Sequence, residues 1–88
     1  MLSKMEQRNL EEISVGNHAL TTARVMMGLS IRYLDYNNFI DALNKANSAR
    51  VSLEVAKRNG VNVDEELKEL SGLYGLIDSK RDSYISTS

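Results

Sequence analysis

The chain contains no proline at any of its 88 positions and only five glycines. Proline and glycine are the residues that most often interrupt a helix, so little in this sequence stops a helix once it has begun. Apolar residues recur three and four positions apart along most of the chain, which is the helical period. The sequence therefore predicts an all-α fold, a small bundle of three to four helices, with residues 1–85 as a single domain and residues 86–88 as a disordered tail.

A chain of this length buries a modest core, and without cysteine it has neither disulfides nor thiolate metal sites to reinforce that core. Regular helix packing and self-association are the remaining sources of stability, and we expect self-association. The net charge of −1 gives no overall attraction to polyanions or membranes. We find no apolar run of membrane-spanning length and a start too charged for a secretory signal, so we expect a cytoplasmic protein with no membrane partner.

Local signals suggest where the helices begin and end. Ser3 and Glu6 have the spacing of a capping box, so the first helix is expected to begin near Ser3. Gly16 and Asn17 either separate this helix from the next or lie inside one long helix, and both alternatives stay open. Asp35 or Asn37 is expected to cap the following helix, and Gly60 fits the left-handed position after its end.

The last helix is expected to begin at a capping box formed by Asn62 and Glu65. The short link before it predicts that the last two helices form an antiparallel hairpin. Small residues recur in both helices and would let the backbones approach closely; they are Ala42, Ala46, Ala49 and Ala56 in one and Ser71, Gly75 and Ser79 in the other. The alternative interpretation of "SGLYGL" is a kink at Gly72 and Gly75.

The segment from residue 18 to residue 34 is apolar on two neighbouring faces, which indicates a helix covered on two sides. In so small a protein the second cover comes either from the chain's own bundle or from another copy. Tyrosine and arginine beside exposed apolar residues are typical of interfaces, and methionine adapts to varied surfaces. The predicted surface for a protein partner or for self-association consists of Leu20, Ala23, Met26, Met27, Ile31 and Tyr33.

Catalysis and metal binding are not supported. On one helix Glu11 and His18 are separated by about 10.5 Å along the axis, too far for the acid to orient the base of a triad with Ser14 or a threonine. One histidine and no cysteine leave mainly carboxylates as metal ligands. The acidic cluster at residues 64–69 is explained by the favourable charge at a helix N-terminus. We therefore predict that the protein is not an enzyme and needs no metal or cofactor.

Two binding hypotheses use charged residues. A cleft between subunits could hold an anionic or nucleotide-like ligand through arginine and an aromatic ring, and its candidates are His18, Arg24, Arg32 and Tyr33. Nucleic acid could contact the basic residues Lys45, Arg50, Lys57 and Arg58. These four are few and scattered around their helix, so nucleic-acid binding is the less favoured of the two.

The preferred hypothesis is a small, non-enzymatic helical interaction protein, an adaptor, regulator or inhibitor that binds protein and associates with itself. A small-ligand binder with an intersubunit pocket is the alternative, and a nucleic-acid accessory protein is the second alternative.

Overall fold

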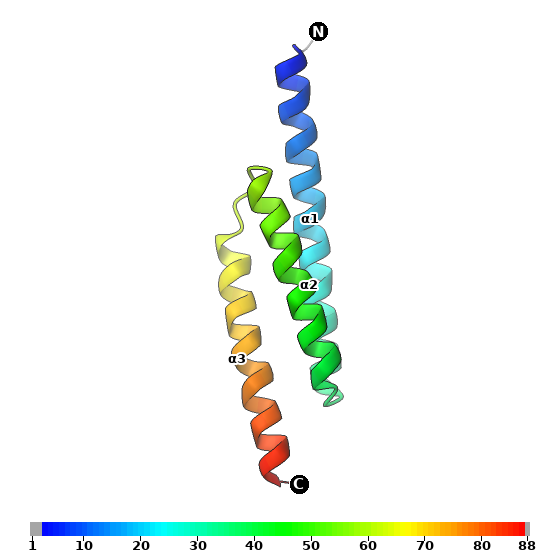
Figure 1. Ribbon diagram of the computed structural model, residues 1–88, viewed down its shortest axis with the longest axis vertical. Helices are drawn as coiled ribbons and strands as arrows, with labels where there is room; N and C mark the ends of the chain where they lie inside the picture. The colour runs from blue at the N-terminus through cyan, green and yellow to red at the C-terminus, as the bar shows by residue number, and fades with distance from the viewer. Residues whose placement is uncertain (1–2, 88) are drawn as a thin grey trace.

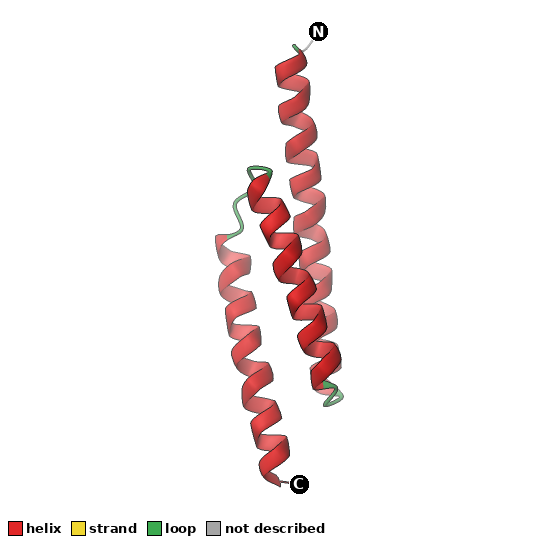
Figure 2. Ribbon diagram, viewed as in Figure 1, coloured by secondary structure: helices red, strands yellow, loops and turns green. Residues whose placement is uncertain are grey.

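The computed structural model describes residues 3–87, which form three α-helices joined by two short loops (Figure 2). Helix α1 spans Lys4–Asp35, α2 spans Phe39–Arg58 and α3 spans Asp64–Thr87. The predicted all-α class is confirmed. Helix α3 continues two residues into the segment expected to be a tail, and Ser88 lies outside the described residues.

The three helices lie roughly along one axis and give an elongated molecule of 64 × 18 × 13 Å (Figure 1). Helix α2 runs back along the second half of α1, and α3 runs alongside α2 in the direction of α1. The first part of α1 extends beyond the loop between α2 and α3. We call this part, residues 4–15, the overhang, and all its side chains are exposed.

Helix α1 passes through Gly16 without a break, which decides between the two alternatives for this position. A Cβ atom at Gly16 would lie 2.6 Å from Val61 Cγ2 and 3.3 Å from the Ala56 carbonyl oxygen. A glycine is required at position 16, because the end of α2 packs directly on the α1 backbone. Its cost of about 1 kcal/mol inside a helix is offset by that packing.

The helix ends follow the predicted signals in part. The Ser3 hydroxyl accepts a hydrogen bond from the Glu6 amide, so α1 starts where expected. Gly60 has φ +85, and the Val61 amide donates to the Ala56 carbonyl, which closes α2 with a Schellman motif.

Two predicted caps are wrong by one to three positions. Asn38, rather than Asp35 or Asn37, caps α2 by accepting from the Asp41 amide at 3.3 Å, while Asn37 takes a left-handed conformation in the turn. Asn62 accepts from the Asp64 amide rather than from Glu65, so its side chain closes the turn just before α3.

Small residues form the contact between α1 and α2. This α1–α2 seam consists of Gly16, Ala19, Ala23 and Ser30 from α1 and Ala42, Ala46, Ala49 and Ala56 from α2, all of them buried. The Ser30 hydroxyl donates to the Ala42 backbone carbonyl at 2.6 Å, which is possible only where the two helix backbones lie very close. The seam ends at Gly16 because α2 itself ends there, and Glu12, one turn earlier on α1, is exposed.

Helix α3 packs more on α2 than on α1. Its buried apolar residues are Leu70, Leu73 and Ile77, with Val63 just before the helix. The Tyr74 hydroxyl donates to Asn47 Oδ1 at 2.5 Å, and the rings of Phe39 and Tyr84 lie 5.5 Å apart, so both contacts join α3 to α2.

The small residues of α3 do not have the role predicted for them. Ser71, Gly75 and Ser79 are exposed, so they bring no helix close to α3. They lie about 100–180° around the helix from Leu70, away from the face that carries Leu70 and Ile77. Helix α3 is one continuous helix through Gly72 and Gly75.

Within the described residues, no helix combines the length and apolar character needed to cross a membrane.

Candidate functional site

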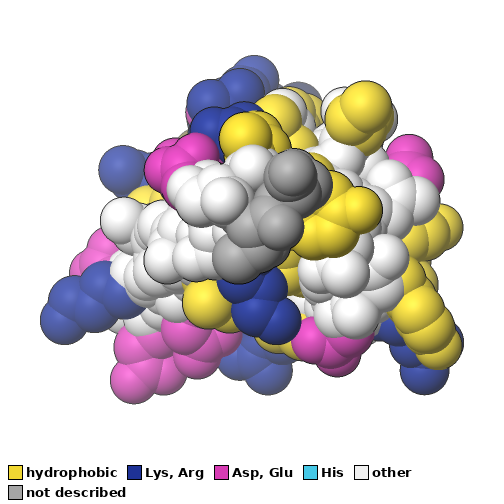
Figure 3. All heavy atoms as spheres, turned by 90° about the horizontal axis from the view of Figure 1, so that it is seen from below, with side chains coloured by type: hydrophobic (Ala, Val, Ile, Leu, Met, Phe, Trp, Pro, Cys, Tyr) yellow, Lys and Arg dark blue, Asp and Glu magenta, His cyan; other side chains and the backbone are white. Residues whose placement is uncertain are grey.

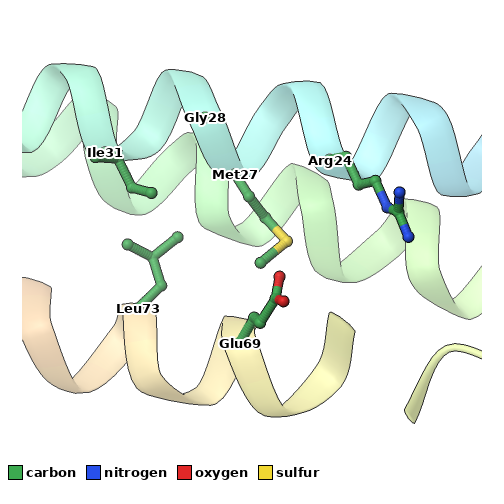
Figure 4. A pocket seen from close by; sticks show the side chains of 6 residues that line it. All are labelled: Arg24, Met27, Gly28, Ile31, Glu69 and Leu73. Atoms are coloured by element: carbon green, nitrogen blue, oxygen red, sulfur yellow. The ribbon is translucent and has the colours of Figure 1, made fainter. Parts of the chain in front are cut away.

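A groove lies between α1 and α3, on the side of the molecule that α2 does not fill (Figure 4). Its volume is about 470 Å³. Ile31 from α1 and Leu73 from α3 point toward one another across it, and Met27 extends toward Glu69. The lining residues are Arg24, Met27, Gly28, Ile31, Glu69 and Leu73. We call this feature the α1–α3 groove; its floor is apolar and its charged residues lie toward one end.

Ion pairs join α1 to α3 near both ends of the groove. Arg24 Nη2 donates to Glu66 Oε1 at 3.2 Å, and Lys80 Nζ lies 3.9 Å from Asp35 Oδ1. The Glu66 side chain is only 9% exposed, whereas that of Arg24 is 65% exposed. The two pairs hold α3 beside α1 without closing the apolar stretch between them.

The groove stays open because the two helices that flank it approach each other least. Helix α3 has fewer contacts with α1 than with α2, and only α1 and α2 share a seam of alanine. Gly28, which faces the groove, has no neighbour within 4 Å of the position of a Cβ atom. The space beside Gly28 is therefore free for another group to approach the α1 backbone.

Apolar residues outside the groove continue the same face of α1. Ile13 and Ile31 are 18 residues apart, which is five full helical turns, and Leu10 lies one turn before Ile13. All three are about half exposed, as is Leu76, one turn after Leu73 on α3. A single face of α1 thus carries exposed apolar side chains both in the overhang and in the groove. Figure 3 shows hydrophobic side chains at the surface among charged ones, seen from the end of α3.

The six residues predicted as an association surface are divided by the fold. Ala23 and Met27 are buried within the chain, so Ala23 in the seam is not available to a partner. Leu20, Met26 and Tyr33 are partly buried against the core. Only Ile31 is substantially exposed, at 47%. Helix α2 therefore covers the second apolar face of residues 18–34. The surface that remains available to a partner lies on the side of α1 that faces α3.

The four residues proposed for an anionic ligand do not come together. His18 and Arg32 are 14 residues apart in one straight helix, which separates them by about 21 Å along its axis. Arg24 contacts Glu66 in α3, while Tyr33 packs against the core. Within one chain these residues form no common pocket.

Three of the four basic residues of α2 lie within about 100° of one another around the helix, and Lys45 lies on another side. Lys45 is partly buried, whereas Arg50, Lys57 and Arg58 are exposed. Lys45 and Arg50 differ by about 140° around the axis, since each residue turns the helix by about 100°. The four residues form no continuous basic stripe.

The residues considered for catalysis are spread along an exposed part of α1. The hydroxyls of Thr21 and Thr22 donate to the carbonyls of Asn17 and His18, one turn earlier. Because the helix is unbroken at Gly16, Glu11 stays two turns from His18. Among the described residues, no group of three or more histidine, cysteine or acidic side chains is placed to hold a metal ion.

No family model matches the chain, and no curated protein and no solved structure matches it.

Leu10 and Ile13 are the site residues that reasoning from the sequence missed. Their signal is a spacing that alternates between three and four residues and continues through Gly16, where the sequence left a break of the helix open. It runs through the positions Leu10, Ile13, Asn17, Leu20, Arg24, Met27, Ile31 and Leu34. This is a heptad pattern with polar residues at two positions, the kind of pattern by which helices pair in a fixed register.

Proposed function

We propose that the protein is a small, non-enzymatic helical interaction protein, an adaptor, regulator or inhibitor, and that its α1–α3 groove binds one helix of a protein partner. The observation that carries the proposal is the open apolar stretch bounded by Arg24–Glu66 and Asp35–Lys80. A groove of this kind suits the apolar face of an amphipathic helix. An antiparallel arrangement of α2 and α3 and a cytoplasmic location are part of this proposal.

The surface area of the chain supports a partner. A compact monomer of 9.9 kDa has an accessible surface of about 5,200 Å², whereas this chain has 6296 Å². The radius of gyration is 16.4 Å, compared with about 12 Å for a compact domain of this length. The excess of about 1,100 Å² exceeds the roughly 800 Å² that each partner contributes to a standard interface.

The geometry of helix bundles supports a helix as the ligand. Helices α1 and α3 run in the same direction and α2 runs in the opposite one (Figure 1). A fourth helix in the groove, antiparallel to both α1 and α3, completes the up-down-up-down order of a four-helix bundle. Gly28 allows such a helix to approach α1 closely.

Site-specific photocrosslinking in the cell that makes the protein tests the proposal. Benzoylphenylalanine is placed at residue 31, in the groove, or at residue 51, on α2, where the natural valine is exposed to a similar extent. We expect a discrete protein adduct from residue 31 and none from residue 51. Adding Leu76→Asp beside the groove is expected to abolish the adduct, because an unpaired charge opposes an apolar contact.

Equal adducts from residues 31 and 51, or an adduct from residue 31 that is insensitive to Leu76→Asp, would overturn the proposed function. The mass of a groove-specific adduct also shows whether the partner is a second copy of the chain or another protein.

A further inference from the structure

We propose that the occupant of the α1–α3 groove is the overhang of a second copy, so that two chains lie antiparallel and each fills the groove of the other. This inference rests on the proposed function and names its partner. Four observations on the overhang and the groove lead to it: matching length, a shared face, direction and charge.

The lengths of the two elements agree. The overhang comprises 12 residues, or about 18 Å of helix. The part of α1 that borders the groove, from Arg24 to Asp35, covers about 16.5 Å along the same axis. A straight overhang is therefore long enough to span the groove from one ion pair to the other.

The apolar face of the overhang is the one that a two-fold symmetric pair requires. In such a dimer each subunit presents the same surface to the other, so the overhang and the groove must share one face of α1. Ile13 and Ile31 meet this condition, since five full turns separate them. Neither isoleucine is fully covered within its own chain.

The direction of the chains follows from the same symmetry. A two-fold axis perpendicular to α1, near its middle, reverses the second chain and lays its overhang along the groove antiparallel to α1 and α3. Each half of the dimer then contains four helices with alternating directions, the arrangement of a regular bundle. A parallel pair of chains would leave both grooves unfilled.

Charge is compatible with this arrangement. Glu6 lies five turns before Arg24 on the same face of α1. In the antiparallel pair Glu6 comes to the end of the groove that carries Lys80, whose own contact with Asp35 is a long 3.9 Å. Both copies make this contact, so its contribution is doubled.

Light scattering coupled to size-exclusion chromatography tests the inference on the purified chain. We expect a mass of twice 9.9 kDa. Leu10→Asp with Ile13→Asp is expected to weaken dimerisation about thirtyfold or more, because both residues would lie at the centre of the contact. Both side chains are about half exposed in the single chain, so the fold of the variant is retained.

Val51→Asp is the matched control. Val51 is 55% exposed, close to the 53% of Leu10, and lies on α2 away from both elements. We expect this variant to remain a dimer. Loss of the dimer in Val51→Asp, or a dimer that survives Leu10→Asp with Ile13→Asp, would overturn the inference.

Single cysteines determine the orientation, without background because the chain has none of its own. Asn17→Cys and Thr21→Cys lie near the proposed axis, so at least one of them is expected to form an intermolecular disulfide on oxidation. Leu10→Cys is expected to form none, since the two copies of residue 10 lie roughly 30 Å apart along the axis. Preferential cross-linking at residue 10 indicates a parallel pair and refutes this model of the dimer.

A monomeric chain at all concentrations also overturns the inference. If a groove-specific adduct to another protein is still formed in that case, the proposed function stands and only the identity of the partner is wrong.

Discussion

The α1–α2 seam and the α1–α3 groove are two contacts of the same helix, and they differ in almost every respect. The seam consists of glycine, alanine and serine, and its closeness lets the Ser30 side chain reach the Ala42 backbone. The groove is lined by larger side chains and bounded by ion pairs. The small residues of the seam let α1 and α2 pack in complete contact. The larger side chains of the groove, with Gly28 among them, leave room for a further helix between α1 and α3.

The difference shows which contact stabilises the chain and which one is available for binding. Seam residues such as Ala23, Ala46 and Ala49 are completely buried, so the seam offers nothing to a partner. In the groove, Ile31 remains 47% exposed. Changes in the seam should therefore act on folding, and changes in the groove mainly on association.

The largest effect is expected from enlarging a seam residue. Ala49→Leu adds three carbons where the side chain is 0% exposed and should reduce the free energy of unfolding by about 3 kcal/mol, through overpacking. Urea denaturation followed by circular dichroism, at one protein concentration, measures it. Ser48→Leu, an exposed neighbour on α2, should stay within about 0.5 kcal/mol of the natural chain. Similar values for both variants would contradict a closely packed seam.

A smaller loss is expected at the end of the seam. Gly16→Ala places a Cβ atom against Val61 and the Ala56 carbonyl and should destabilise the chain by about 1–2 kcal/mol, even though alanine favours the helix. The midpoint of urea unfolding measures this loss. An increase in stability would mean that the end of α2 does not lie on the α1 backbone.

The Arg24–Glu66 pair tests one boundary of the groove. Arg24→Ala leaves the buried Glu66 carboxylate without its cation and should cost about 1 kcal/mol. Combining it with Glu66→Met removes the buried charge and should restore the loss, which a double-mutant cycle in urea can measure. If Arg24→Ala has no effect by itself, the pair contributes as little as an ordinary surface ion pair.

The smallest effects distinguish two exposed glycines. Gly28→Ala and Gly75→Ala meet no neighbour and should each stabilise the folded chain by about 0.5–1 kcal/mol. Only Gly28 faces the groove, so only Gly28→Ala should also weaken dimerisation, measured by light scattering over a range of concentrations. A similar weakening by Gly75→Ala would place the contact on the other side of α3.

Features determined by neighbouring residues could be predicted from the sequence. The start of α1 at Ser3 and the left-handed Gly60 depend on local hydrogen bonds and backbone sterics, and both predictions are confirmed. The cap of α2 was misplaced because Asp35, Asn37 and Asn38 all have side chains that can cap and lie within four positions.

Features that depend on distant segments could not be predicted in the same way. The alanines of α2 and the Ser71, Gly75 and Ser79 of α3 have similar spacing, yet only the alanines are buried, because burial depends on where α1 lies. Leu10 and Ile13 were missing from the predicted association surface because their exposure also depends on distant segments. Their exposure follows from the overhang extending beyond the α2–α3 loop, which depends on how the three helices pack.

The unbroken passage of α1 through Gly16 has a consequence for how the first turns of that helix form. A free helix of 12 residues is marginal in water because its nucleation is unfavourable. The overhang does not need a nucleus of its own, since it extends a helix already fixed by α2, but it lacks the tertiary contacts that would keep it from fraying. Its helicity should therefore rise with protein concentration, and slow amide exchange in residues 4–15 would report that a partner is bound.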